Sequence, residues 1–577
     1  MTAATKTRKR APSAKRAPST KRSGAATHDP ITVEIIQSSL QAISDEMFAT
    51  MRKTAMSSII YEVLDFGVCV CDARGDLASS GSGIPAFVGM LDWGIKAVLA
   101  KYDQPGDIGP GDVFATNIPH RGGVSHMNDV TLMLPVFADG RLIAWVANKA
   151  HWVDMGGMSP GSIDPQATEV FQEGLQLPEV KLIEAGEPIR PVMDIIMANV
   201  RLPDIATGDL WAGVASMRSG EKRLMELAAK YGTDTVIHAI DQYMDYGEAV
   251  TRKALKAMPK GTFRAEDSLD DGRKLVAEVT VTDKEFIVDL TDNPEQDAGP
   301  FNASYASTCV DAQMLFKAVT SPETPANAGS FRPLKVVCAP RTICNAQFPA
   351  AMGLYYEVGI RFLDLIWKAL APHMPEKLSA GHYASICGTI VGGVHPDTGK
   401  PHSFIEPEIG GWGAAPGQDG DNAQYTGFHG DTFNCPAEVN EARNGVMIDQ
   451  YALNPEPGGE GQFTGGRGIV MDYRVRADDG FLTVGYTRSK FPAWALDGGN
   501  EGSPNYVEFI PNEGERQRFA FVSGLKTQRD DVIRVVTGNG GGFGDPKKRD
   551  PERVRRDVRN GLISAERACE VYGVTIE

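Results

Sequence analysis

The sequence has few cysteines for its length, and their spacing argues against several classes of protein. Eight cysteines are spread over 577 residues, and no two of them form a CxxC pair. Paired thiols mark most cysteine-bound zinc sites, and dense cysteines mark small secreted domains. We therefore expect reduced, mostly buried thiols in a cytoplasmic protein. Cys69 and Cys71 lie in a predicted strand, and we expect their side chains on opposite faces of it.

The sequence also lacks several motifs that would place a function. No apolar stretch reaches about 18 residues, so we expect no membrane span. It has no GxxxxGK[ST] phosphate loop and no GxSxG nucleophile elbow. None of its Gly-rich runs opens a helix straight after a strand, so we interpret them as turns and close backbone packing. The chain therefore has no predicted ATP site of its own. The Gly-rich runs are 410–413, 458–461, 465–468 and 538–544.

Basic residues are scarce outside the N-terminus. The net charge is −16, yet residues 1–28 hold eight Lys or Arg and no acid. The other 50 basic and 74 acidic residues give −24, which argues against nucleic-acid binding by the folded part. The tail lacks the apolar region of a secretory signal. We interpret it as a disordered, solubilising extension; the alternative is a tether to acidic partners or nucleic acid.

The length and the changing periodicity indicate several domains. We predict an α+β fold with mixed β-sheets, packed helices and a Gly-rich, β-dominated C-terminal half. A helix should begin near Ile31, with Asp29 as N-cap and Pro30 at its first position. The predicted regions are a basic tail (1–28), an N-terminal α+β domain with the functional site (29–260), a mixed and β-rich region (261–545) and a C-terminal helical segment (546–577).

Individual elements can be predicted from the hydrophobic pattern. Alternating apolar residues predict strands, and spacings of three and four predict helices. The turn at 72–76 should join two strands of a hairpin. The predicted strands are 68–71, 130–137, 142–147, 275–281 and 286–290, and the predicted helical regions are 206–256, 354–372, 550–560 and from 564 onward.

Four residues in the predicted N-terminal domain have the side chains of a divalent metal site. They are Asp65, His126, Asp129 and His151. The chain has only ten histidines, and three of them lie within 32 positions, beside Asp and paired Gly. Imidazole and carboxylate are ligands of Zn, Mn and Fe(II). All four residues flank predicted strands, so they could meet at one end of a sheet. The alternative is ordinary hydrogen bonding of a surface His and a turn Asp.

Two further polar residues stand near these four in the sequence. His120 and Asp154 could be ligands, partners that orient the ligands, or general acid and base groups. The alternative for each is ordinary hydrogen bonding without a catalytic role.

From about residue 30 the chain resembles the hydantoinase B/oxoprolinase family. The resemblance begins with Leu64-Asp65-Phe66, with Gly122-Gly123 before His126-x-x-Asp129, and with His151-x-x-Asp154-x-Gly156-Gly157. Later motifs agree with it. They include Glu173-Gly174-Leu175-Gln176-Leu177-Pro178, Asn327-Ala328-Gly329 and Gly540-Gly541-Gly542-Phe543-Gly544-Asp545-Pro546.

The resemblance implies the metal-bearing B-type component of an ATP-dependent amidohydrolase that acts on a hydantoin, oxoproline or lactam. In this family an A-type ATPase partner holds ATP and Mg and phosphorylates the substrate, and a Zn or Mn centre in the B-type component completes the reaction. Carried over by position, Asp65, His126 and His151 are the first ligand candidates, followed by Asp129. The resemblance also implies a hetero-oligomer with two or more copies of the chain.

The chain departs from its relatives at three places near the predicted site. His151-Trp152 replaces consecutive histidines, Phe87 stands where a His is common, and Ile118-Pro119-His120 replaces Asp-Pro-Tyr. Three other functions stay open. The chain could be part of an ATP-dependent ketone carboxylase that uses bicarbonate, a non-catalytic assembly subunit, or a nucleic-acid binder through its tail.

Overall fold

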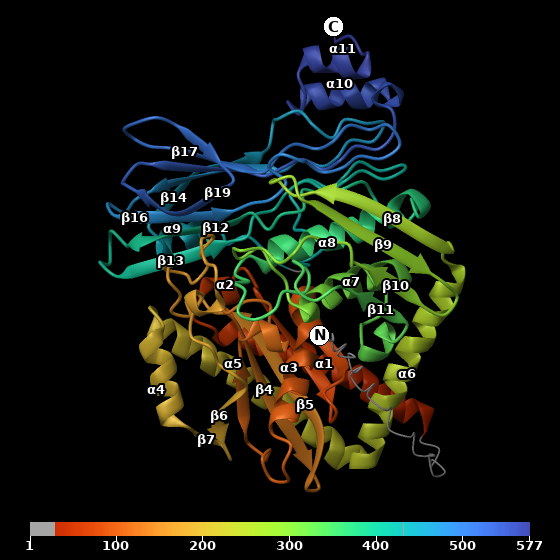
Figure 1. Cartoon of the computed structure of the whole chain (residues 1–577), viewed down its shortest axis with the longest axis vertical. Helices are drawn as coiled ribbons and strands as arrows, with labels where there is room; N and C mark the ends of the chain where they lie inside the picture. Colours follow the sequence, from red (N-terminus) through yellow and green to blue (C-terminus); the bar gives the residue numbers. More distant parts are fainter. Residues whose placement is uncertain (1–28, 431, 577) are drawn as a thin grey trace, which may run out of the picture.

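The computed structural model describes residues 29–430 and 432–576, so the predicted basic tail lies outside the described residues. Within them, 11 α-helices and four sheets form an α+β fold, which confirms the predicted class (Figure 1). The α-helices are α1 (Pro30–Thr54), α2 (Ser58–Tyr61), α3 (Pro85–Lys101), α4 (Arg190–Asn199), α5 (Pro203–Tyr231), α6 (Thr233–Ala257), α7 (Tyr305–Thr320), α8 (Tyr355–Leu370), α9 (Ala437–Arg443), α10 (Pro551–Arg559) and α11 (Ala565–Tyr572).

Five short 3-10 helices lie in the connections between these elements. They are η1 (Pro119–Arg121), η2 (Val170–Gln172), η3 (Ala328–Phe331), η4 (Ala371–His373) and η5 (Pro546–Lys548).

The first sheet is antiparallel throughout and carries the site. Its strands in spatial order are β2 (Leu77–Gly83), β1 (Phe66–Asp72), β5 (Arg141–His151), β4 (Asp129–Ala138), β3 (Val113–Thr116), β6 (Val180–Glu184) and β7 (Glu187–Pro188). The predicted hairpin is the β1–β2 connection, and the strands predicted at 130–137 and 142–147 lie in β4 and β5.

Helices cover both faces of this sheet. Alternate residues such as Val68 and Val70 pack on the side of α1 and α5, while Cys69 and Cys71 pack on the side of α3. The expectation that these two cysteines point to opposite faces was wrong. Side chains two residues apart in a strand share a face, and their Sγ atoms lie 3.6 Å apart.

The ends of the long helices follow from local capping. The Asp29 carboxylate accepts hydrogen bonds from the backbone N–H groups of Ile31 and Thr32, which confirms the predicted N-cap of α1. The predicted helical region 206–256 is divided into α5 and α6 at Gly232. This residue has φ of +88°, a conformation that favours glycine and ends the first helix.

A second sheet packs with α7 and α8 beside the first. Its order is β11 (Leu334–Val337), β10 (Phe286–Asp289), β9 (Lys274–Val281) and β8 (Gly261–Ser268). The β10–β11 pair is parallel and the others are antiparallel, so this sheet is mixed. Helix α8 contacts β8, β9 and α7. Tyr355, at its N-terminus, donates a hydrogen bond to Asp129 of the first sheet.

Two more sheets form the β-rich part of the C-terminal half, and α10 and α11 extend from it at the top of Figure 1. One has the order β13 (Pro401–Glu406), β12 (Gly388–Val394), β16 (Gly480–Gly485) and β19 (Phe521–Thr527). The other has the order β14 (Val446–Leu453), β15 (Ile469–Val475), β20 (Val532–Val536), β17 (Tyr506–Ile510) and β18 (Gln517–Phe519).

The Gly-rich runs pack against one another, as the sequence indicates. A Cβ atom on Gly411 would lie 2.1 Å from the carbonyl oxygen of Gly466 and 2.5 Å from the nitrogen of Gly540. These glycines therefore allow a backbone-to-backbone contact that no larger residue permits.

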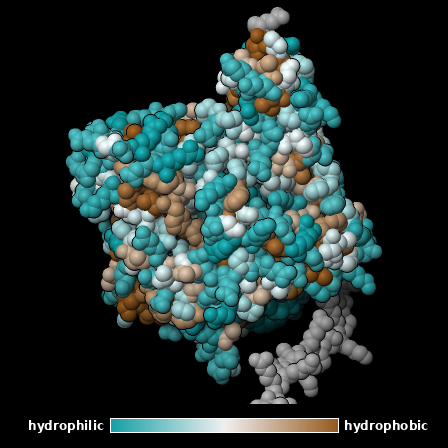
Figure 2. All heavy atoms as spheres, turned by 45° about the horizontal axis from the view of Figure 1, so that its top comes forward, coloured by the Kyte–Doolittle hydropathy of each residue, from teal (hydrophilic) through white to brown (hydrophobic). Residues whose placement is uncertain are grey.

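The described surface is mainly polar. Hydrophobic side chains on the face seen in Figure 2 gather in small separate groups. Among the described residues, no helix has the length and apolar character needed to cross a bilayer.

Candidate metal centre

Three adjacent strands of the first sheet bring acidic and imidazole side chains into one row. Asp129 is the first residue of β4 and pairs directly with His151, the last residue of β5. Asp65 precedes β1, and its carbonyl oxygen accepts the backbone N–H of His151 at 3.1 Å. Residues opposite each other in a sheet share a face, so these side chains lie together on the α3 side.

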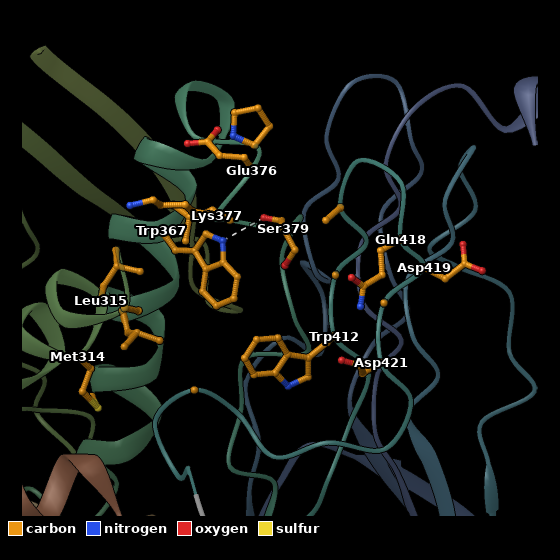
Figure 3. Close-up of a pocket in the computed structure, with 18 residues that line it drawn as sticks. Met314, Leu315, Trp367, Glu376, Lys377, Ser379, Trp412, Gln418, Asp419 and Asp421 are labelled. Atoms are coloured by element: carbon orange, nitrogen blue, oxygen red, sulfur yellow. Dashed lines mark hydrogen bonds between the residues drawn. The ribbon is translucent and has the colours of Figure 1, made fainter. Parts of the chain in front are cut away.

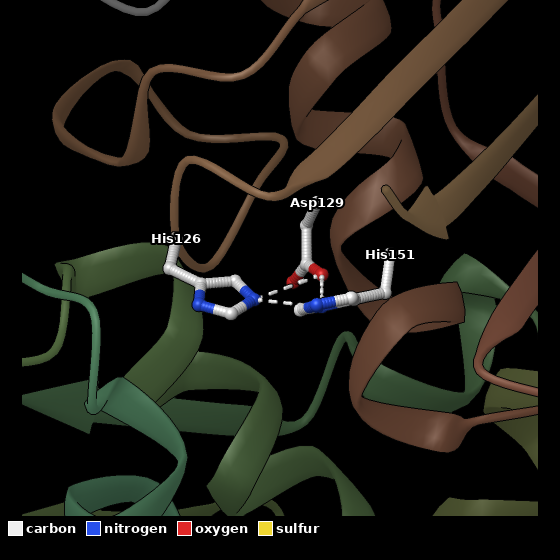
Figure 4. Close-up of side chains that lie close together, drawn as sticks. All are labelled: His126, Asp129 and His151. Carbon is white, nitrogen blue, oxygen red and sulfur yellow. Dashed lines mark hydrogen bonds and ion pairs between the residues drawn. The ribbon is translucent and has the colours of Figure 1, made fainter. Parts of the chain in front are cut away.

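His126 joins this row from the turn before β4 (Figure 4). Its Nε2 lies 3.1 Å from Asp129 Oδ1 and 3.3 Å from His151 Nδ1, and His151 Nδ1 lies 3.4 Å from Asp129 Oδ1. All three side chains are buried. The structure therefore brings together three of the four predicted ligands, and Asp65 lines the same cavity.

The donor separations fit a transition metal. Ligand bonds of about 2.0–2.1 Å in a tetrahedral site place neighbouring donors roughly 3.3 Å apart. The three measured separations lie close to this value. Without a cation or a proton between them, these atoms would turn their lone pairs towards each other. The residues present thus fit a divalent ion with two imidazole ligands and one carboxylate ligand.

The orientation of His126 is set by a backbone carbonyl. Its Nδ1 lies 3.1 Å from the Gly353 oxygen, and only a protonated Nδ1 can donate to that oxygen. This tautomer leaves the Nε2 lone pair facing Asp129 and His151. The Gly353 peptide is fixed in turn by the buried Glu173, whose carboxylate accepts the N–H groups of Met352 and Gly353. Burial raises the pKa of Glu173 to about 7 despite these two bonds.

The second oxygen of Asp129 is held away from the imidazoles. Ser125 donates to Oδ2 at 2.5 Å and Tyr355 donates to it at 3.4 Å. Lys149 donates to the Ser125 hydroxyl at 2.7 Å and lies 3.7 Å from Oδ2. These contacts leave Oδ1 directed at the two histidines.

Charge and burial oppose each other at Asp129 and Lys149. Burial disfavours a charged Asp129, but the positive charges of Lys149 and of His126 in its protonated form outweigh that cost and hold its pKa well below the usual value. Burial lowers the pKa of Lys149 to about 8, although Asp129 opposes the shift. The Lys149 ammonium also lies 4.2 Å from the centre of the Phe87 ring, which is a cation–π contact.

Asp65 has no such stabilisation. Burial raises its pKa to about 7, against the opposing effect of His151. A cation bound beside a carboxyl of this kind would displace its proton and supply the missing positive charge. The preceding residue, Leu64, has φ of +64°, a conformation that a branched side chain rarely adopts and that fits a functional constraint.

The cavity in front of the row is small and closed by both halves of the chain. It has a volume of about 30 Å³. The N-terminal half contributes Asp65, Ile84, Phe87, His126 and His151, and the C-terminal half contributes Tyr355, Tyr356, Ile386, Ile405, Pro407, Phe428 and His429. The predicted site region, residues 29–260, thus includes the proposed metal ligands. It leaves out the seven cavity-lining residues of the C-terminal half.

His120 and Asp154 lie apart from this group. The Asp154 carboxylate accepts the N–H groups of Gly156, Gly161 and Arg201 and pairs with the Arg201 guanidinium at 2.7 Å, so it fixes the loop after β5. His120 contacts the Phe348 ring instead, and burial lowers its pKa to about 4. Neither residue lines the cavity.

Several residues of the site were missed by the sequence reasoning. Lys149 had a signal, because it is the one charged residue in the apolar run Leu142–Ala150. His429 also had one, since it lies between Gly427 and Gly430 in a chain with few histidines. Tyr355 and Glu173 had none, because their roles depend on contacts between residues 226 and 179 positions apart.

A larger groove of about 390 Å³ lies between α8 and the loop 412–421 (Figure 3). Trp367 and Trp412 form its walls, and Asp421 lies at its edge. None of the proposed metal ligands lines it, so we place the chemistry at the smaller cavity despite the difference in volume.

Comparison with known proteins agrees with this geometry. A sequence model described as hydantoinase B/oxoprolinase matches residues 29–546. The chain belongs to the hydantoinase B/oxoprolinase family. It is 32% identical to the B-type component of a putative D-/L-hydantoinase of Pseudomonas sp. (strain NS671), over 95% of each chain.

Two solved structures share the fold. The crystal structure of ATP-dependent caprolactamase from Pseudomonas jessenii matches with a TM-score of 0.89 and 28% identity, over 96% of this chain and 97% of that one. A nucleotide-free acetone carboxylase structure matches with a TM-score of 0.87 over 95% of this chain and 80% of that one. At 20% identity, the second match shows the fold alone.

Proposed function

We propose that this chain is the metal-binding subunit of an ATP-dependent enzyme that hydrolyses a cyclic amide. The substrate class is a hydantoin, an oxoproline or a lactam, and a partner ATPase of the A type activates it by phosphorylation. The observation that carries the proposal is the buried group of His126 Nε2, His151 Nδ1 and Asp129 Oδ1. Zinc and manganese are the ions that suit these ligands and the family.

The chemistry of the substrate explains the need for two different subunits. An amide carbonyl is a poor electrophile, and phosphorylation of its oxygen makes the carbon easier to attack. A divalent ion held by His126, Asp129 and His151 would lower the pKa of a water molecule in the cavity and favour that attack. The surrounding aromatic and aliphatic side chains keep other water away.

Two observations support a separate ATPase subunit. The Gly-rich runs, which are the segments with the composition of phosphate loops, pack against backbone rather than around an open cradle. The relatives include the B-type component of a putative hydantoinase and a caprolactamase that is ATP-dependent. We therefore propose a hetero-oligomer in which the A-type partner binds ATP and Mg.

The test is reconstitution with an A-type partner. The purified complex should hold a divalent transition metal and should release ADP and ring-opened product from at least one of a panel of hydantoins, lactams and 5-oxoproline. His126→Ala and His151→Ala should each lose the metal and the turnover, because each removes one imidazole ligand.

Each rival function gives a different result in the same assay. Turnover of a ketone only with bicarbonate would identify a carboxylase and overturn the proposal. A metal-free complex whose activity is unchanged by both substitutions would identify a non-catalytic assembly subunit. Salt-sensitive nucleic-acid binding that disappears when residues 1–28 are deleted would support a role for the tail.

A further inference from the structure

The metal cavity is too small for the ring that the proposed function requires. Its volume of about 30 Å³ is enough for roughly two water molecules. Sites that bind small organic molecules usually have volumes of about 300 Å³ or more. A hydantoin, an oxoproline or a lactam therefore needs a larger site that lies next to the metal ligands.

A groove of suitable size runs along one face of α7. Its volume is about 380 Å³, and β2, the start of α3 and the segment between α7 and β11 form its other sides. We call it the α7 groove. Its lining is mostly apolar with a few polar side chains, as is typical of small-molecule sites. The α7 residues that line it occupy positions i, i+3, i+4, i+7 and i+8, which share one helix face: Val310, Gln313, Met314, Lys317 and Ala318.

The α7 groove and the metal cavity share a thin wall. The two chain segments of this wall lie close together, because a Cβ atom on Gly430 would lie 2.7 Å from Pro85 Cδ. Ile84, Phe87 and Phe428 also pack in one apolar cluster. The α7 groove therefore lies directly behind residues that line the metal cavity. In three places two consecutive residues line the two spaces, the first named the metal cavity and the second the groove: Ile84 and Pro85, Phe87 and Val88, and Phe428 and Gly427.

Lys317 is the only charged residue that lines the α7 groove among the described residues. Its ammonium donates hydrogen bonds to the carbonyl and hydroxyl oxygens of Ser321 and to Thr324 Oγ1, all of them neutral acceptors. These bonds fix the ammonium in the turn after α7, where Pro322 also lines the groove. Burial lowers the pKa of Lys317 to about 8, so it remains mostly protonated at neutral pH. No acidic side chain in the described part of the chain pairs with it, so its positive charge acts on the groove.

We infer that the α7 groove binds the cyclic amide and that Lys317 attracts an anionic group carried by this ligand. The inference rests on the proposed function, which supplies the class of ligand. The volume and the apolar lining fit a small ring, and a single positive charge disfavours a cationic ligand. Two groups have the required charge: the phosphate of the activated amide, and a carboxylate of the substrate, as in 5-oxoproline.

The shared wall determines how the ring reaches the metal ligands. Met314 lines the groove and packs against the apolar cluster that contains Ile84 and Phe428. A ring in contact with Met314 thus lies next to this wall. Displacement of the Ile84 and Phe428 side chains would open the groove to the metal cavity, which His126 and His151 line. The groove therefore holds the amide, and the metal cavity is where it is hydrolysed.

The first experiment fills the α7 groove from two sides in the complete complex with the A-type partner. Ala318 on α7 and Ser82 on β2 are exposed, so Ala318→Trp and Ser82→Trp add bulk to the groove without replacing a core residue. Each should lower kcat/KM for ring opening by about 10-fold or more, because the ring loses its binding site. The metal content, measured by mass spectrometry, and the Tm should stay at the wild-type values. Ala249→Trp on α6 is the matched control, since Ala249 is exposed but does not line the groove, and it should leave kcat/KM unchanged.

The second experiment removes the charge from the groove. Lys317→Gln keeps a side chain that can donate to the Ser321 oxygens, whereas Lys317→Arg keeps the charge. The glutamine variant should raise KM by about 10-fold, and the arginine variant should stay closer to the wild type. An effect on every amide would identify the phosphate of the activated amide as the anionic group. An effect on 5-oxoproline alone would identify the carboxylate of the substrate.

The possible failures can be told apart. If the wild-type complex hydrolyses amides, an unchanged kcat/KM in both tryptophan variants or an unchanged KM in Lys317→Gln would overturn the inference while the proposed function stands. Loss of activity in Ala318→Trp alone would overturn it in favour of the larger groove, which Ala318 also lines and Ser82 does not. Folded tryptophan variants that no longer co-purify with the A-type partner would overturn it by making the groove a docking surface. A wild-type complex that hydrolyses none of the amides would overturn the proposed function, and the inference with it.

Discussion

The two oxygens of Asp129 have different tasks. Oδ1 faces His126 and His151, while Oδ2 accepts a hydrogen bond from Ser125 that Lys149 supports from behind. Residue types and spacing were enough to nominate the histidines and Asp129. They could not identify the supporting role of Ser125, and Lys149 was distinguished only as the single charge in an apolar run, because such roles depend on which atoms meet in the folded chain.

Removal of the Ser125 hydroxyl should therefore weaken metal binding. Ser125→Ala leaves Oδ2 without its shortest hydrogen bond and frees the carboxylate to rotate. We expect about 10- to 100-fold lower metal affinity, measured by competition with a chelator. Ser44→Ala is the control, since Ser44 is equally buried but bonds to Leu40 O in α1. An equal loss of affinity in both variants would contradict this role of Ser125.

At the scale of elements, the loop before β4 depends on close contact with α3. Gly123 has φ of +86°, and a Cβ atom there would lie 2.5 Å from Gly94 Cα. The adjacent glycines Gly122 and Gly123 indicated a tight turn from the sequence alone. The sequence could not show which helix packs against that turn. It was also wrong about Cys69 and Cys71, where the two-residue period of a strand requires a shared face.

Gly123→Ala tests this contact. The new methyl group must push the loop and α3 apart, so we expect a loss of about 2 kcal/mol or more in the free energy of unfolding, with lower metal occupancy. Gly140→Ala provides the comparison, because Gly140 has φ of +70° but no atom within 4 Å of its Cβ position. Chemical denaturation should show a clearly smaller loss for Gly140→Ala; equal losses would refute the role of the contact.

Helix α8 is tied to two distant segments by Glu357. Its buried carboxyl accepts hydrogen bonds from Ser385, Ile386 and Thr487, and burial still raises its pKa to about 7. A raised carboxyl pKa means that the folded chain holds the proton more tightly than the unfolded chain. The resulting stabilisation is complete below the unfolded pKa of about 4.5 and is lost as the pH rises through about 7.

The variant Glu357→Gln removes this titration. Relative to the variant, the wild-type chain should lose up to about 3 kcal/mol of unfolding free energy between pH 4.5 and 7. Urea denaturation at several pH values gives this difference. The exposed Glu376→Gln should show no comparable pH dependence. A constant difference between wild type and Glu357→Gln across this range would exclude the proposed proton uptake.

At the scale of the whole molecule, the site depends on both halves of the chain. The predicted α+β class, the strands β1, β4 and β5 and the family were all accessible from the sequence, because they follow from hydrophobic period and local motifs. The closing wall was not accessible. Residues of this wall such as Tyr355 and Phe428 lie more than 200 positions from His126 in the sequence, and they reach the cavity only through packing of the two halves of the chain. No local pattern records such an approach.

A metal ion that joins the strands of the first sheet should stabilise the whole fold. At a free concentration 100 times its dissociation constant, an ion that binds only the folded chain adds about 2.7 kcal/mol. We therefore expect a higher Tm with Zn²⁺ or Mn²⁺ and a lower Tm after chelation, measured by calorimetry. His126→Ala should abolish the difference. A Tm independent of metal in the wild-type chain would contradict this prediction.

The direct pairing of Asp129 with His151 has a further consequence for folding. A slip of one residue between β4 and β5 would turn one of these side chains to the opposite face of the sheet. The same slip would also turn buried polar side chains of that strand towards the apolar face of the sheet that packs on α1 and α5. Only correctly aligned strands bring the two ligand candidates together, so uptake of the proposed ion would report the alignment of the sheet. An occupied site would thus distinguish a correctly folded chain from a misaligned one.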